Sequence, residues 1–263
     1  HGLTVAKENG ASVPEELLRG GIEWLKRYES GQTEMIRFWK KRKKKTKKRA
    51  DALDALIRRV LGATGADQAE MLGFLKRDRV HLPVYAKCLL GLELHRTGAV
   101  KERDETIRNI EQFLKQDPEN QTAWLELGNG GYWWRWYGSE FEAHACYLKL
   151  LAVAKPRSAQ ASGLAKYLVN NRKHATYWKS TRDTSYCVEA LADYLRASGE
   201  DEPEMEVEIL LDGKTLKTVK ISKENLFSYD GMVTVAGDVL ATGRHKVELR
   251  RSGKGPLYAN VYL

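Results

Sequence analysis

The sequence predicts an α+β protein in which a mostly helical part is followed by a small antiparallel β-sheet. Up to about residue 200, apolar residues recur at the three- and four-residue spacing of amphipathic helices. From Glu204 they alternate with polar residues, as in half-buried strands. Between the two patterns stand Ser198-Gly199, a typical helix end, and Pro203. We therefore expect a helical domain at 1–200 and a β domain at 203–263.

The stretch from Trp178 to Leu195 connects the two parts. Ser180 or Thr181 can cap a helix start, and Asp183 completes a reciprocal capping pattern with Ser180. The apolar residues that follow lie on one helix face, because their spacing is i, i+3, i+4, i+7 and i+8: Cys187, Ala190, Leu191, Tyr194 and Leu195. The sequence therefore predicts a helix that ends at Ser198-Gly199.

Eight to ten helices of similar length are predicted in all, joined by short connections that favour antiparallel hairpins. Ser12 caps the first of them ahead of Pro14, and Pro83 opens a later one that Gly98 closes. Apolar spacing or end signals place the others at Gln32–Lys41, Leu53–Leu61, Met71–Leu75, Ile107–Leu114, Gln121–Leu127, Glu140–Ala154 and Ala161–Leu168.

The β part begins with an alternating strand at Glu204–Leu211. Asp212-Gly213 supplies a two-residue hairpin turn, and Lys214–Ile221 forms the return strand. Three more strands are expected, at Val233–Val235, Lys246–Arg250 and Leu257–Leu263. About five strands in this length make one sheet or half of a sandwich.

Several segments, taken in order, resemble parts of one protein family. Trp178, the run Ser180–Thr184 and the helix ending at Leu195 resemble the last helix of the thioester domain in bacterial alpha-2-macroglobulins. Earlier helices of that domain are similar to Gly2-Leu3-Thr4 with Val13-Pro14, to Gly21–Leu25 and to Ala50–Leu56. The end of the CUB-like β domain that follows is similar to Leu240–Gly243, Val247–Leu249 and Gly253–Tyr258.

This resemblance implies a fold and a function. The helices would form an α/α toroid, incomplete at its N-terminus, and the strands the second half of a CUB-like domain whose sheet face is apolar and unfinished. The whole protein would be a broad-spectrum protease inhibitor, not an enzyme, that traps proteases by conformational change. It would be periplasmic or extracellular, with proteases and its own neighbouring domains as partners. This piece has no signal sequence, and both its ends indicate an excerpt.

The reactive element of the family is a thioester formed by a Cys-x-Glu-Gln motif. Cys187-Val188-Glu189-Ala190 lacks the glutamine amide, so no thioester is expected in this chain, and the resemblance places the motif upstream of His1. An odd number of widely spaced cysteines, Cys88, Cys146 and Cys187, argues against disulfides and a zinc site. We expect three buried thiols, no metal and no cofactor.

One segment supplies the whole net charge of +9. Lys40 to Arg49 holds nine basic residues in ten, and the rest of the chain has 35 basic residues (44 minus 9) against 35 acidic ones. Nucleic-acid binding proteins usually spread their basic groups over a folded face, so nucleic acid is not the expected partner. The interpretation we favour is a solvated, mobile loop between helices, and the alternative is a contact with a polyanion.

An aromatic cluster at residues 130–138 offers a possible contact surface through Trp133, Trp134 and Trp136. The rings could instead fill one end of the helical barrel. A glycan-binding or glycan-processing toroid remains an alternative function, and as an enzyme it needs paired carboxylates near these rings. Candidates are Glu126, Glu140 and Glu142. The sequence contains no metal-binding histidine pattern, phosphate loop or nucleophile elbow, and no stretch long and apolar enough to span a membrane.

Overall fold

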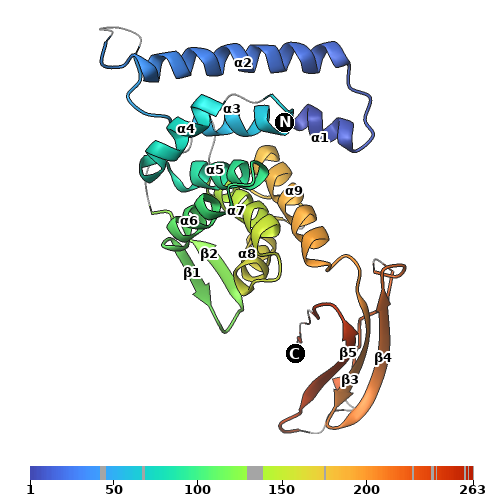
Figure 1. The fold of residues 1–263 in the computed structure, drawn as a ribbon. Coiled ribbons are helices and arrows are strands. Elements are labelled where there is room, and N and C mark those ends of the chain that lie inside the picture. Colours follow the sequence, from blue (N-terminus) through green and yellow to red (C-terminus); the bar gives the residue numbers. More distant parts are fainter. Residues whose placement is uncertain are drawn as a thin grey trace. The chain divides into compact units, whose positions relative to one another are not determined.

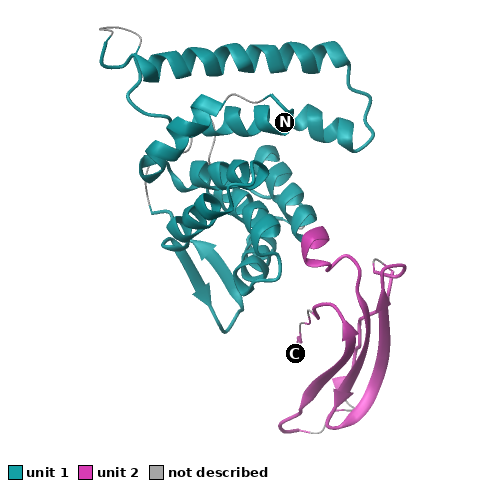
Figure 2. Ribbon diagram, viewed as in Figure 1, with its two compact units in different colours: residues 1–194 teal, residues 195–263 magenta. Residues whose placement is uncertain are grey.

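The computed structural model describes residues 1–41, 46–66, 69–128, 139–174, 176–226, 228–237, 240, 242–257, 259, 261 and 262. The chain divides into two compact units, His1–Tyr194 and Leu195–Leu263 (Figure 2). The predicted α+β class is confirmed, since the described residues form nine α-helices and two small antiparallel sheets. None of the described helices is long and apolar enough to cross a membrane.

The first unit contains the helices and one hairpin (Figure 1). In chain order its elements are α1 (Gly2–Glu8), α2 (Glu15–Arg37), α3 (Ala52–Ala63), α4 (Ala69–Asp78), the 3₁₀ turn η1 (Arg79–His81), α5 (Val84–Arg96), α6 (Val100–Glu111), β1 (Leu114–Asp117), β2 (Thr122–Leu125), α7 (Glu140–Ala154), α8 (Ala159–Asn170) and α9 (Thr181–Ser198), whose last turn belongs to the second unit.

Helix α5 is the centre of this unit. Every residue from Val84 to Leu94 is buried, because α3 packs on one side of the helix and α6 and α7 pack on others (Figure 1). Helix α2 covers α3, and α8 packs on α7 and on strand β2. A helix that is apolar nearly all round is suited to such a central position.

Buried charges join the outer helices to this core. The side chain of Arg58 on α3 is 1% exposed, and its guanidinium lies 3.2 Å from Glu29 on α2 and 3.5 Å from Glu93 on α5. It also donates a hydrogen bond of 2.6 Å to the carbonyl oxygen of Ala66. Burial raises the pKa of Glu29 to about 7, although the charge of Arg58 acts in the opposite direction.

Two predictions about the first helices are wrong. The expected helix at Gln32–Lys41 is the C-terminal part of α2, which runs unbroken from Glu15 to Arg37. The inward stripe that begins at Leu18 continues through Glu29, Thr33 and Ile36, so its polar members hid the continuity in the sequence. Ser12 is not the cap, because Pro14 precedes the helix and no side chain caps it.

The predicted helices at Ile107–Leu114 and Gln121–Leu127 also need correction. Helix α6 ends at Glu111, and the next residues form the antiparallel hairpin β1–β2. The Asp117 carboxylate accepts hydrogen bonds from the backbone amides of Glu119 and Asn120, which fixes the tight turn. Alternate burial along β2 then places Ala123 and Leu125 inward. Helix α8 approaches this strand closely at Gly163, where a Cβ would lie 3.0 Å from the Ala123 backbone nitrogen.

The remaining helical predictions are confirmed. Helices α4, α5, α7 and α8 coincide with the apolar spacing that predicted them, and α9 ends at Ser198 with Gly199 in the left-handed region at φ 78°. Helix α3 is present too, but its polar side is buried as well as its apolar side, because α2 and α5 flank it.

The second unit is a three-stranded antiparallel sheet with the order β4-β3-β5. Its strands are β3 (Glu204–Leu211), β4 (Lys214–Ser222) and β5 (Val247–Lys254). Asp212 and Gly213 both have positive φ, 49° and 81°, so the predicted two-residue hairpin is confirmed. The strands expected at Val233–Val235 and Leu257–Leu263 are absent from the described residues there, so the described sheet ends at β4 on one side and at β5 on the other.

The two faces of this sheet differ in chemistry. On one face opposite charges lie across neighbouring strands, in the pairs Glu204 with Lys254, Glu206 with Lys220 and Glu208 with Arg250. The other face carries a small apolar cluster of Met205, Val207, Val219 and Ile221. The alternation read from the sequence therefore produces one charged and one apolar face.

We predict that Gly62→Ala destabilises the protein. A Cβ at Gly62 would lie 2.4–2.7 Å from the carboxylate atoms of Glu93, which are held by Arg58 and Arg96. We expect a net loss of about 1–3 kcal/mol in urea denaturation, since overpacking outweighs the helix propensity of alanine. Gly73→Ala on α4 is the matched control, because nothing lies within 4 Å and a gain of up to about 1 kcal/mol is expected. Equal stability of the two variants would contradict a fixed Glu93.

Candidate functional site

The predicted aromatic surface cannot be placed in the fold. Trp133, Trp134 and Trp136 lie outside the described residues, together with the rest of 129–138. Their role as a contact surface therefore stays a prediction. The described residues on either side belong to β2, which ends at Leu125, and to α7, which begins at Glu140.

A polar cluster with two buried carboxylates, here called the α7–α9 clasp, joins the starts of the two helices. It consists of Ser139, Glu142, Ser180, Arg182 and Asp183. The Asp183 carboxylate accepts hydrogen bonds from the hydroxyls of Ser139 and Ser180, the latter at 2.8 Å. Each serine also caps its own helix, since Glu142 N–H donates to Ser139 and Asp183 N–H donates to Ser180. The predicted cap at Ser180 is therefore confirmed.

An ion pair completes the clasp. The Glu142 side chain is 2% exposed, and Arg182 approaches both of its carboxylate oxygens, with 3.3 Å from Nη2 to Oε2. Arg182 itself is 41% exposed and lies over the ring of Tyr186. Both carboxylate oxygens of Glu142 are therefore occupied by the guanidinium of Arg182. This geometry suits a structural ion pair between helices.

The three acids proposed for glycan chemistry have separate partners. Glu126 is exposed and lies 3.4 Å from Lys115 of the neighbouring strand. Glu140 is exposed and accepts a hydrogen bond of 3.2 Å from the hydroxyl of Tyr167, while Glu142 is buried against Arg182. Among the described residues, the structure does not bring these carboxylates together as an acid–base pair.

An aromatic stack that the sequence did not reveal lies beside the hairpin. The ring of Tyr167 is 4.8 Å from His144 and 6.2 Å from Trp124, measured between centroids. His144 is fully buried: its Nε2 accepts a hydrogen bond of 2.8 Å from Leu125 N–H, and its Nδ1 lies 2.7 Å from the Glu140 carbonyl oxygen. These partners select the neutral imidazole, and burial lowers the pKa of His144. This histidine is a core residue.

The three cysteines are buried free thiols, as predicted. Burial raises the pKa of Cys146 and of Cys187 to about 12 and raises that of Cys88 as well, so the nucleophilic thiolate is suppressed at all three. Glu189, two residues after Cys187, pairs with Lys149 on α7. The Cys187–Ala190 segment therefore serves the packing of α9 against α7.

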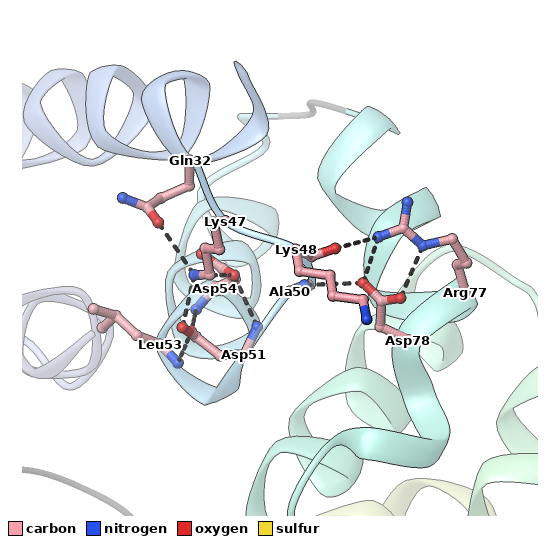
Figure 3. A network of polar contacts seen from close by, with 9 residues as sticks. All are labelled: Gln32, Lys47, Lys48, Ala50, Asp51, Leu53, Asp54, Arg77 and Asp78. Atoms are coloured by element: carbon pink, nitrogen blue, oxygen red, sulfur yellow. Dashed lines mark hydrogen bonds and ion pairs between the residues drawn. The ribbon is translucent and has the colours of Figure 1, made fainter. Parts of the chain in front are cut away.

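The basic run is more ordered than predicted. Residues 42–45 lie outside the described residues, but Lys47 is a structural residue (Figure 3). Its amine lies 2.6 Å from Asp54, 2.7 Å from Asp51 and 3.1 Å from the amide oxygen of Gln32. Burial disfavours the charged amine, but the hydrogen bonds to the two aspartates outweigh it and raise the pKa of Lys47. A mobile, solvated loop is therefore the wrong description for this end of the run.

The residues that follow the run are also held by hydrogen bonds. The backbone amide of Ala50 donates to Asp78 at 2.9 Å, and Asp78 is bonded to Arg77 on the same helix (Figure 3). Asp51 then caps α3 in a reciprocal capping box with Asp54. The chain from Lys47 to Asp51 thus links α2, α3 and α4.

Within the described ranges, no group of three or more histidine, cysteine, aspartate or glutamate side chains could hold a metal ion. His245 pairs with Asp212 at the hairpin turn, and His95 lies against Arg103. Comparison with protein-family models gives no match to this sequence, and comparison with curated proteins gives none either.

We predict that Arg182→Ala lowers the free energy of unfolding by roughly 3 kcal/mol, because it removes the guanidinium that contacts both oxygens of the buried Glu142 carboxylate. This loss of unfolding free energy is at the low end for breaking a buried ion pair, because Arg182 is partly exposed to solvent. The matched control is Lys115→Ala, which breaks the exposed pair with Glu126 and should change stability by less than about 0.5 kcal/mol. Urea denaturation measures both, and similar values for the two variants would contradict the assignment.

We also predict that the folded chain has no reactive thiol. A thiol reagent such as Ellman's reagent should titrate three cysteines per chain in denaturant and essentially none before unfolding. Methylamine, which opens thioesters, should release no additional thiol from the native chain. A methylamine-dependent increase that mass spectrometry maps to Cys187 would show that this cysteine is bonded to something other than hydrogen.

Proposed function

We propose that this chain is a scaffold part of an alpha-2-macroglobulin-like protease inhibitor that traps its target by conformational change. The observation that carries the proposal is the order of elements around α9. Helix α9, preceded by Trp178-Lys179-Ser180 and capped by Ser180, follows a series of packed helices. It leads directly into an antiparallel sheet that starts at Glu204.

The proposal assigns each unit a finer fold. The helices of the first unit would belong to an α/α toroid of paired helices that is completed by residues before His1. The sheet of the second unit would be the second half of a CUB-like domain. Its apolar side supports this assignment, because Ile209 is only partly buried there and Leu249 on β5 is 37% exposed. Such a face would be completed by the first half of the domain elsewhere in the parent chain.

The reactive bond would also come from elsewhere in the parent. Cys187 is buried in α9, and Ala190 has no side-chain amide with which to close a thioester. Covalent capture of a protease therefore requires a Cys-x-Glu-Gln motif upstream of His1. In this proposal the chain supplies no catalytic residue, and it works in the periplasm or outside the cell with proteases and neighbouring domains as its partners.

The glycan-processing alternative receives no support from the described acids, because Glu126, Glu140 and Glu142 each have a different partner. A glycan-binding surface at Trp133, Trp134 and Trp136 remains testable by tryptophan fluorescence during titration with oligosaccharides. An unchanged spectrum would count against it.

The decisive experiment uses the parent protein. Its gene should encode a long chain with a Cys-x-Glu-Gln motif and several β domains before His1. Incubation of the parent with a protease should protect a large protein substrate while cleavage of a small peptide substrate continues, because a trapped protease keeps its active site. The 263-residue chain alone should protect neither substrate. A parent without upstream domains, or inhibition of both substrates alike, would refute the proposal.

A further inference from the structure

The described residues on both sides of 42–45 are bonded to the helices. The backbone amide of Lys47 donates to the Met35 carbonyl oxygen at 3.3 Å, so the chain at Lys47 returns to the end of α2. The side chain of Lys47 fixes this return through Gln32, Asp51 and Asp54 (Figure 3). Before the basic run, at the end of α2, Arg37 pairs with Glu70 on α4. The described residues at both ends of the basic run are therefore held by the fold.

Most of the charge at this place is not compensated. The sequence from Ile36 to Ala50 contains no acidic residue. Arg37 and Lys47 have carboxylate partners, but the described structure shows no ion pair for four other exposed cations: Lys40, Lys41, Lys48 and Arg49. The charge of Arg49 acts on the Asp78 carboxylate, which already accepts hydrogen bonds from Arg77 and from the Ala50 amide. The sequence places four more basic residues at 42–45, outside the described residues.

An exposed tryptophan lies within this group of cations. The Trp39 side chain is 38% exposed, and the amine of Lys48 lies 5.4 Å from the centre of its ring. An indole has an apolar body and one polar N–H, which is the combination that favours the boundary between lipid headgroups and acyl chains. Lysines beside such a ring attract anionic headgroups as point charges.

We propose that Trp39, Lys40, Lys41, Lys48 and Arg49 form a docking surface for an anionic lipid bilayer. A nucleic acid or a long acidic polysaccharide would contact a wide area of the protein surface. Outside the basic run the chain has 35 basic and 35 acidic residues, so it offers no net positive charge to such a ligand. A planar bilayer instead needs only one local group of cations to contact its anionic headgroups, and Trp39 adds an apolar contact. The inference is independent of the protease-trapping proposal.

The test is co-sedimentation of the purified chain with vesicles at low salt. Wild type should bind phosphatidylglycerol–phosphatidylcholine vesicles and not pure phosphatidylcholine, and added salt should release it. Each cation near such a surface strengthens binding about five-fold. The variant with Lys40, Lys41, Lys48 and Arg49 all changed to glutamine should therefore bind about 600-fold more weakly if all four contribute, and at least about 25-fold more weakly if two of them do.

A matched variant removes the same number of charges from exposed positions elsewhere in the first unit: Arg19→Gln, Lys26→Gln, Arg27→Gln and Lys101→Gln. It should bind within about three-fold of wild type. Trp39→Ala should weaken binding several-fold with the salt dependence unchanged, because only the apolar contact is lost. Circular dichroism and thermal unfolding check that each variant is folded.

Three results would overturn the inference: equal vesicle affinity of the two glutamine variants, no binding of wild type to anionic vesicles, or tighter binding of wild type to RNA or heparin than to vesicles at the same salt concentration. The last result would assign the same surface to a polyanion in solution.

Discussion

The buried guanidinium of Arg58 is the interaction on which the N-terminal half of the structure depends. Arg58 belongs to α3 and contacts one carboxylate on each of the two helices that flank α3, Glu29 on α2 and Glu93 on α5. An unpaired charge in such a place would be very costly, so the three helices must assemble together. Two neighbouring features depend on this cluster. Gly62 must lack a side chain because the Glu93 carboxylate lies beside it. The contact also holds α2 against α3, the two helices between which the basic run lies in the sequence.

A second set of polar contacts, the α7–α9 clasp around the buried carboxylates of Glu142 and Asp183, joins helices in the C-terminal half of the helical unit. Its hydroxyls and charges satisfy one another and the first amides of two helices. Groups of this kind could belong to an active site, but catalytic groups need a free position facing a substrate. In the clasp, the oxygens of Glu142 and Asp183 are already engaged by Arg182 and by two serines. This arrangement supports a scaffold role for the chain.

Sequence reasoning succeeded where one periodicity dominated. The apolar faces of α7, α8 and α9 and the turn at Asp212-Gly213 were predicted because local spacing and turn chemistry agree with the fold. It failed at β2, where Thr122–Leu125 is too short to show a period and depends on an Asx turn and on packing against α8. It also missed Arg58, Glu29 and Lys47, because charged residues in a sequence are normally exposed and only their partners, distant in the chain, reveal that they are buried.

The buried thiols have a consequence for biosynthesis. Cys88 on α5 and Cys146 on α7 are inaccessible once these helices pack together, but a newly made chain exposes both. In an oxidising compartment, non-native disulfides would compete with the docking of α5 on α7. Rapid helix docking would then protect the nascent chain from mispairing, and its rate would limit the yield of mature protein.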